Sequence, residues 1–148
     1  SSTSRGLGDV YKRQEHMMAT KLYQNNAKVH FNHFVEKGGR FGKRIVYGGH
    51  VISLTRALTF NGLSNAFKII AINGGTHASP CFAGTTVFAW STILDKIEVS
   101  DKLGALRIRS NGIGDAQAYQ FQHRDANNRF DPSVLLSLDY WALIPRKN

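Results

Sequence analysis

The main constraint on the fold is an apolar stretch that repeats at helical spacing and begins at a pair of glycines. Its apolar and small residues fall on one face of an α-helix: Val51, Leu54, Thr55 and Leu58. Ile52 and Ala57 widen this face, so we expect a helix over residues 47–60 that other elements largely enclose. Asn61 and Gly62 follow the stretch, and this pair is typical of a helix end.

Gly48 and Gly49 stand where this helix is expected to begin. Without a Cβ, they let another backbone or a ligand approach the first-turn N–H groups, which have no acceptor within the helix. Such donors, at the positive end of the helix dipole, suit a carbonyl oxygen that gains negative charge during a reaction. The alternative, which the glycines alone favour, is a turn with no further role.

Apolar stretches after the helix have the composition or the alternation of strands: residues 66–73, 86–94, 103–110 and 135–144. In the last stretch one face collects Leu136, Leu138, Tyr140 and Ala142. Residues 111–115 contain Asn-Gly and are expected to form a turn, after which residues 116–122 resume pairing. A buried helix followed by an antiparallel run of strands predicts an α+β fold in one domain, with the sheet wrapped around the helix.

The composition narrows the classes of function. The formal net charge is +9, but the chain has no basic stripe, zinc-ligand pattern or RNA-binding aromatic motif, so we expect no nucleic-acid partner. An anionic small ligand would use the same charge. No apolar run approaches the ~20 residues of a membrane span, so no membrane association is expected. The single cysteine, Cys81, excludes an internal disulfide and fits the reducing cytoplasm.

The beginning of the chain does not look native. Residues 9–14 read as the translation of the transposon mosaic end that is used to prepare sequencing libraries. We therefore expect residues 1–14 to be an adapter scar that packs against nothing substantial. Residues 15–148 would be the natural domain, truncated on its amino-terminal side. A basic signal peptide does not explain the segment, because no apolar run follows it.

Three motifs resemble those of the MaoC-like dehydratases. Asn-Asn-Ala-Lys-Val-His at residues 25–30 stands where that family has Asp-x-Asn-Pro-Leu-His, and Tyr47-Gly48 stands where it usually has His-Gly. Pro-Cys-Phe-Ala-Gly-Thr-Thr-Val at residues 80–87 is similar to its Pro-Val-x-x-Gly-Asp-Thr-Leu. The resemblance extends over residues 15–146 and implies a hotdog fold, with this chain as one half of a double-hotdog protein. The implied partner is a second hotdog unit, either a missing amino-terminal half or another copy of the chain.

The resemblance also implies an activity. A hydro-lyase of this kind adds water reversibly across the C=C bond of an enoyl-CoA thioester, and a branched dicarboxylyl-CoA such as mesaconyl-CoA is the expected substrate. Coenzyme A would enter as part of the acyl-CoA substrate, with no separate cofactor. Two other classes stay open: a non-catalytic half that binds CoA or supports a dimer, and a hotdog thioesterase that cleaves the thioester.

His30, in the matched motif, is the expected proton carrier, because imidazole titrates near neutral pH. Asn25 stands where the family has an aspartate, and three explanations remain open. Asn25 orients the water through its amide, or a carboxylate comes from the missing half or a neighbouring subunit, or the site is degenerate. In this resemblance Gly48 and Gly49 hold the thioester oxygen.

The remaining candidates surround this set. Tyr47 would line the acyl pocket or simply pack, and Asn32 would position the loop at the pocket. A basic loop offers candidates for the phosphates of coenzyme A, with a solvated loop as the alternative: Arg40, Lys43 and Arg44. His50 is expected to pack within the helix, whereas His77 lies near the expected pantetheine arm. The histidines lack the paired spacing of zinc ligands, so we expect no metal.

Overall fold

The computed structural model describes residues 3–5, 9–10, 15–115 and 124–146, with side chains described from residue 15 onward. The helices are α1 (Glu15–Leu22), α2 (Lys28–Phe31), α3 (His33–Glu36), α4 (Gly48–Leu58) and α5 (Phe60–Leu63). The strands are β1 (Thr3–Arg5), β2 (Asp9–Val10), β3 (Lys68–Thr76), β4 (Thr86–Glu98), β5 (Leu103–Gly114) and β6 (Val134–Pro145).

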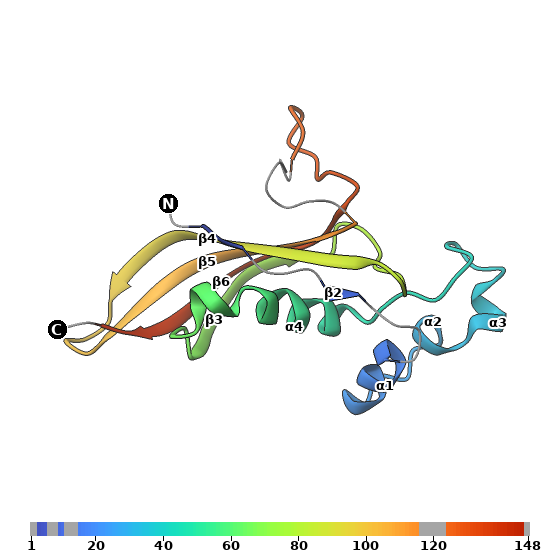
Figure 1. The fold of residues 1–148 in the computed structure, drawn as a ribbon, viewed down its shortest axis with the longest axis horizontal. Coiled ribbons are helices and arrows are strands. Elements are labelled where there is room, and N and C mark those ends of the chain that lie inside the picture. The colour runs from blue at the N-terminus through green and yellow to red at the C-terminus, as the bar shows by residue number, and fades with distance from the viewer. Residues whose placement is uncertain (1–2, 6–8, 11–14, 116–123, 147–148) are drawn as a thin grey trace.

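The strands form one antiparallel sheet in the order β1-β4-β5-β6-β3, and β2 also pairs with β4. The sheet curves, α4 lies along one of its faces, and α1 to α3 extend beyond one end of α4 (Figure 1). The predicted α+β arrangement of a central helix against an antiparallel sheet is therefore confirmed. Of the helices α1 to α3, α1 contacts α4, and all three extend from the end of α4 that carries the two glycines.

The core lies between α4 and the sheet. Val51 and Thr55 of α4 are fully buried, and the predicted apolar face of β6 is buried along its length. The buried apolar side chains in this layer include Val46, Val51, Val87, Ile108, Leu136, Leu138, Tyr140 and Ala142. Removal of this apolar surface from water is the main force that holds the helix on the sheet.

Residues 111–114 belong to β5 and not to the predicted turn. The Asn-Gly signal was misleading because Gly112 serves packing: a Cβ there would lie 2.5 Å from Oγ1 of Thr55. Asn111 is buried as well, in register with Trp90 of β4. The glycine lets the strand pass close under α4, so the sheet continues to Gly114.

Two details of the helix prediction are wrong. The helix is not enclosed, because Ser53 and Ala57 are exposed on the side that faces away from the sheet. The chain also does not end its helical path at residues 61–62, which lie within the short helix α5. A single sheet covers only one side of a helix, so the apolar face of α4 is narrower than the sequence suggests.

The beginning of the chain pairs with the sheet. The backbone of β1 and β2 pairs with β4, so the expectation that residues 1–14 pack against nothing is wrong for these two strands. An adapter origin stays a prediction, because an open strand edge offers unpaired N–H and C=O groups to any segment nearby. The pairing expected for residues 116–122 lies outside the described residues.

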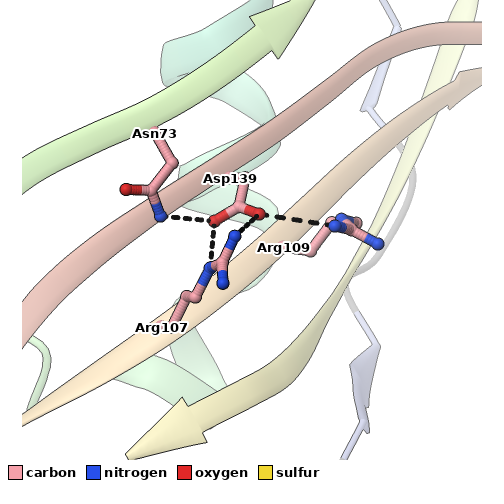
Figure 2. Close-up of polar contacts among 4 residues, drawn as sticks. All are labelled: Asn73, Arg107, Arg109 and Asp139. Atoms are coloured by element: carbon pink, nitrogen blue, oxygen red, sulfur yellow. Dashed lines mark hydrogen bonds and ion pairs between the residues drawn. The ribbon is translucent and has the colours of Figure 1, made fainter.

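One carboxylate ties three strands together on the sheet face opposite α4. Asp139 of β6 accepts two hydrogen bonds from Arg107 at 3.0 Å each, one from Arg109 at 3.3 Å and one from Asn73 at 2.9 Å (Figure 2). The Arg107 hydrogen bond holds the pKa of Asp139 below its ordinary value. Asn73 lies in β3, so this cluster joins the edge strand to the centre of the sheet.

Candidate functional site

His30, the expected proton carrier, is buried and held in a fixed orientation. Its side chain is only 7% exposed, and Nδ1 lies 3.0 Å from the carbonyl oxygen of Ile45. A carbonyl oxygen can only accept, so Nδ1 carries the proton and Nε2 of the neutral ring keeps its lone pair. The ring also meets Tyr47 edge-on, with centroids 5.6 Å apart, and this contact restricts its orientation.

His30 opens into a cavity of about 230 Å³, which we call the His30–His77 cavity. It is lined by His30, Ile45, Val46, Gly48, Val51, His77, Ser79, Pro80, Cys81 and Leu135. The lining is mostly apolar, with two imidazoles and one helix start. Burial raises the pKa of Cys81 to about 12, so the thiol in this cavity stays protonated and is no nucleophile.

The first turn of α4 reaches this cavity with free N–H groups. Tyr47 is the N-cap but makes no side-chain cap hydrogen bond, and its carbonyl accepts the N–H groups of His50 and Val51. The N–H groups of Gly48 and Gly49 find no backbone acceptor among the described residues. These amides and the helix dipole create positive potential at the cavity wall.

Each glycine of the pair meets an aromatic ring. A Cβ on Gly48 would lie 2.8 Å from Nε2 of His77, and one on Gly49 would lie 2.6 Å from Cε1 of Tyr47. Only Gly48 lines the His30–His77 cavity, whereas the Tyr47 ring covers Gly49. The two glycines are therefore required by close packing and do not form a simple turn.

Neither asparagine candidate lines the cavity with His30. Oδ1 of Asn25 accepts the N–H of Ala27 at 2.9 Å, and Oδ1 of Asn32 accepts the N–H of Val35 at 3.1 Å. The first contact shapes the turn before α2, and the second caps α3. Asn32 therefore caps a helix, and the carbonyl oxygen of Asn25 is engaged within its own turn.

The three cations of the basic loop have different surroundings. Arg44 donates to Sδ of Met17 at 2.8 Å and to the carbonyl of Phe31 at 3.3 Å, so it holds α1 against α2. Nζ of Lys43 lies 4.1 Å from the centroid of the Phe82 ring. Both cations line a cavity of about 160 Å³ together with His16, His33 and Ala83. Arg40 is exposed and stacks on the neighbouring Phe41.

No pattern in the sequence distinguishes His16, which the fold buries completely. Both of its ring nitrogens lack a hydrogen-bond partner. Burial lowers the pKa of His16, and the charges of Arg44, His30 and His50 lower it further. His16 is therefore a neutral ring packed close to the candidate proton carrier.

Two further properties concern the described residues only. They contain no group of three or more histidine, cysteine, aspartate or glutamate side chains that could hold a metal ion. Nor do they contain a helix that is both long enough and apolar enough to cross a membrane.

Known structures define the class to which this arrangement belongs. A MaoC domain dehydratase from Chloroflexus aurantiacus superposes with a TM-score of 0.93 at 51% identity, over 99% of this chain and 43% of that one. A double-hotdog protein of Mycobacterium tuberculosis, 21% identical, shares the fold with a TM-score of 0.69 over 98% of this chain and 38% of that one. The chain thus has the predicted hotdog fold, and it matches less than half of each of these two longer proteins.

Curated sequences point to particular relatives, although no family model matches the chain. It is 53% identical to β-methylmalyl-CoA dehydratase of Chloroflexus aurantiacus over 142 residues, 95% of this chain and 40% of that protein. It is 52% identical to mesaconyl-CoA hydratase of Cereibacter sphaeroides over 140 residues, 94% of this chain and 40% of that protein. The chain spans less than half the length of these relatives. Both matches are longer than residues 15–148 and so take in part of the first fourteen residues.

Proposed function

We propose that this chain carries the proton-transfer half of a hydro-lyase site, which adds water across the C=C bond of an enoyl-CoA thioester. The observation that supports this most directly is the shared cavity. One wall carries a buried imidazole with its Nε2 lone pair free, and another carries the free amide of Gly48. These are the two groups that hydration of a conjugated thioester requires.

The proposed reaction uses His30 twice. Nε2 of His30 takes a proton from water while the water oxygen forms a bond to the β-carbon of the enoyl group. The π electrons move toward the thioester oxygen, where the N–H of Gly48 and the positive end of α4 stabilise the developing enolate. The imidazolium of His30 then returns the proton to the α-carbon as the carbonyl re-forms. Atoms and charge balance without a separate cofactor.

The substrate proposal comes from the relatives. Their names, β-methylmalyl-CoA dehydratase and mesaconyl-CoA hydratase, describe one reaction in its two directions. We propose mesaconyl-CoA as the substrate of the assembled protein. The cavity is mostly apolar and offers its polar groups at His30, His77 and the start of α4, which suits a short acyl group joined to a thioester.

The position of Asn25 favours one of its three explanations. Its carbonyl oxygen is held by Ala27, and the residue is absent from the lining of the His30–His77 cavity. We propose that a group from the second hotdog unit orients the attacking water. The variant Asn25→Asp tests this, because a carboxylate in the same turn should then change turnover only slightly.

Two exposed apolar surfaces support a second unit as the partner. Every residue of the edge strand β3 is exposed, including Ile70 at 48% and Ile72 at 65%. At the other end of the fold Leu22 is 83% exposed and Phe34 is 88% exposed. An open apolar strand edge is unfavourable in water, so we propose that these surfaces contact the second unit.

The remaining assignments are of smaller weight. We propose that Lys43, with help from the surface residue Arg40, meets the phosphates of coenzyme A, while Arg44 serves mainly to hold α1 and α2. Cys81 is a buried, protonated thiol, and this fits a reducing cytoplasm as the compartment.

The test is to incubate the purified chain with mesaconyl-CoA, alone and with the remaining portion of the Chloroflexus aurantiacus relative. Loss of the enoyl-thioester absorbance without free thiol supports the hydro-lyase. Release of free CoA thiol would indicate a thioesterase, and no reaction in either preparation would indicate a non-catalytic half. Sedimentation of the same samples reports assembly, and a monodisperse monomer with full turnover would contradict the need for a second unit. Itaconyl-CoA and crotonyl-CoA, assayed beside it, compare acyl groups through kcat/KM.

A further inference from the structure

The mechanism above does not use the second imidazole of the His30–His77 cavity. His77 follows the last residue of β3 and lies in the segment before Pro80, which cannot continue a central strand. Its ring lies against the start of α4, so close that a Cβ on Gly48 would be 2.8 Å from Nε2 and 3.0 Å from Cε1. The residue is partly open to solvent while its ring lines the cavity, which places it at the mouth.

No other contact explains this ring position. Among the described residues His77 has no hydrogen-bond partner and no ring or ion-pair contact, unlike His30, which is held by Ile45 and Tyr47. The nitrogen nearest the helix start is therefore available to a ligand. Its neighbour there is the free amide of Gly48, the group that we assign to the thioester oxygen.

We propose that His77 is a further catalytic residue, whose neutral imidazole donates an Nε2–H hydrogen bond to the thioester oxygen beside the Gly48 amide. This inference rests on the proposed function. Two donors would then meet the oxygen that gains negative charge: the amide of Gly48 and the imidazole of His77. Such donors act on the transition state more than on the bound substrate, because the oxygen is more negative there.

Donation fits this position better than proton transfer. Partial burial lowers the pKa of His77, so the ring is neutral at neutral pH and holds one N–H donor. The positive end of α4 also disfavours an imidazolium at this point. A neutral imidazole is a poor source of a full proton but a good hydrogen-bond donor, and His30 already serves as the base.

The geometry of possible replacements makes the proposal testable. Glutamine places its amide nitrogen at about the reach of the histidine Nε2, and it donates a hydrogen bond but transfers no proton at neutral pH. Asparagine is shorter by one carbon and falls short of that position. Leucine keeps apolar bulk and has no donor at all.

The experiment measures kcat and KM of the assembled protein with mesaconyl-CoA for His77→Leu, His77→Gln and His77→Asn. For His77→Leu we expect kcat to fall by ~10²–10³-fold, the usual effect of one lost oxyanion donor, with KM changed by less than ~3-fold. His77→Gln should recover most of kcat, and His77→Asn should recover little. Asp101→Ala is the control, because that residue is exposed in the segment between β4 and β5 and does not line the cavity.

The remaining outcomes would overturn the inference alone or together with the proposed function. A His77→Gln variant as slow as His77→Leu would mean that the ring acts by proton transfer or by packing. This result would overturn the inference. A His77→Leu variant as fast as the parent would also overturn it, while the proposed function would stand if the parent hydrates mesaconyl-CoA. A parent without hydration would overturn both.

Discussion

The two ends of α4 are built in opposite ways. At its C-terminal end two side chains use their donors inside the fold: Arg56 donates to the hydroxyl of Tyr140 at 3.0 Å and to the carbonyl of Ala66 at 2.6 Å, and Thr59 donates to the helix backbone. At its N-terminal end the amides of Gly48 and Gly49 have no such acceptor among the described residues. In Figure 1 the second end is the one from which the helices α1 to α3 extend.

The difference separates stability from function along one helix. Buried polar groups that are satisfied within the chain, such as the Arg56–Tyr140 pair, hold the helix on the sheet. Donors without a partner at a cavity are retained at a cost to the folded chain, and a ligand relieves that cost. We therefore expect changes at the N-terminal end to affect turnover and changes at the C-terminal end to affect unfolding.

The largest effect is expected at the N-terminal end. His30→Ala should lower turnover of mesaconyl-CoA by ~10²–10⁴-fold, because it removes the proposed acid and base, and should leave CoA affinity nearly unchanged. Initial rates and a CoA-binding titration measure the two quantities. Asn25→Ala is the comparison and should cost less. A His30→Ala variant with parental turnover would remove this residue from the proposed mechanism.

The next effect concerns stability. Gly112→Ala should destabilise the chain by about 1–3 kcal/mol, because the new Cβ would lie 2.5 Å from Oγ1 of Thr55 in the packed layer under α4. Urea unfolding measures the change. The double variant Gly112→Ala/Thr55→Ala should lose less than the sum of the two single variants, since the second change removes the clash. Simple additivity would show that this contact does not set the cost.

A smaller change, in turnover and not in stability, is expected from Gly48→Ala. A Cβ at this position would displace the His77 ring, whereas alanine itself is a better helix former than glycine. Turnover should fall by about 10-fold, with little change in the free energy of unfolding, since about 1.4 kcal/mol of barrier corresponds to this factor. Gly38→Ala is the control, because a Cβ on Gly38 would meet only the carbonyl oxygen of Val35, at 3.9 Å. Equal losses of turnover in both variants would contradict the proposed role of the helix start.

The smallest effect is expected from Tyr140→Phe. Loss of the hydroxyl leaves Arg56 and Ser110 without a shared partner in a buried network, at a cost of about 1 kcal/mol. Thermal or urea unfolding measures it, and turnover should stay close to that of the parent. Tyr23→Phe, at an exposed position, should change stability by less than ~0.5 kcal/mol. A Tyr140→Phe variant of normal stability but reduced turnover would contradict the proposal that this end of α4 affects unfolding and not turnover.

Much of the fold was readable because it follows from periodicity. The spacing of Val51 and Thr55 predicts α4, and the alternation through Leu138 and Tyr140 predicts β6. The signal failed at Gly112, where Asn-Gly usually marks a turn, because the reason for that glycine is a helix far away in sequence. Local patterns carry no information about such a contact.

The candidate site was readable in part for the same reason. His30 and the glycine pair were found through motifs that keep close sequence spacing, but the meeting of His77 with Gly48 depends on β3 and the following segment returning to the helix start. His16 was missed because nothing next to it in the sequence distinguishes a buried histidine from an exposed one. The predicted roles of these residues stay predictions until turnover is measured.

The acceptor that holds His30 is a main-chain oxygen, and this has a consequence for how the site tolerates sequence change. Any residue at position 45 supplies the same carbonyl, so a substitution of Ile45 does not by itself alter the tautomer of the histidine. What must be preserved is the path of the backbone, which is held by the Ile45–Phe82 bridge and by the N–H of Ile45 bonding to the carbonyl of Val29. The tautomer of His30 is thus preserved by the backbone path of a loop, and a comparison of side chains alone would not detect this.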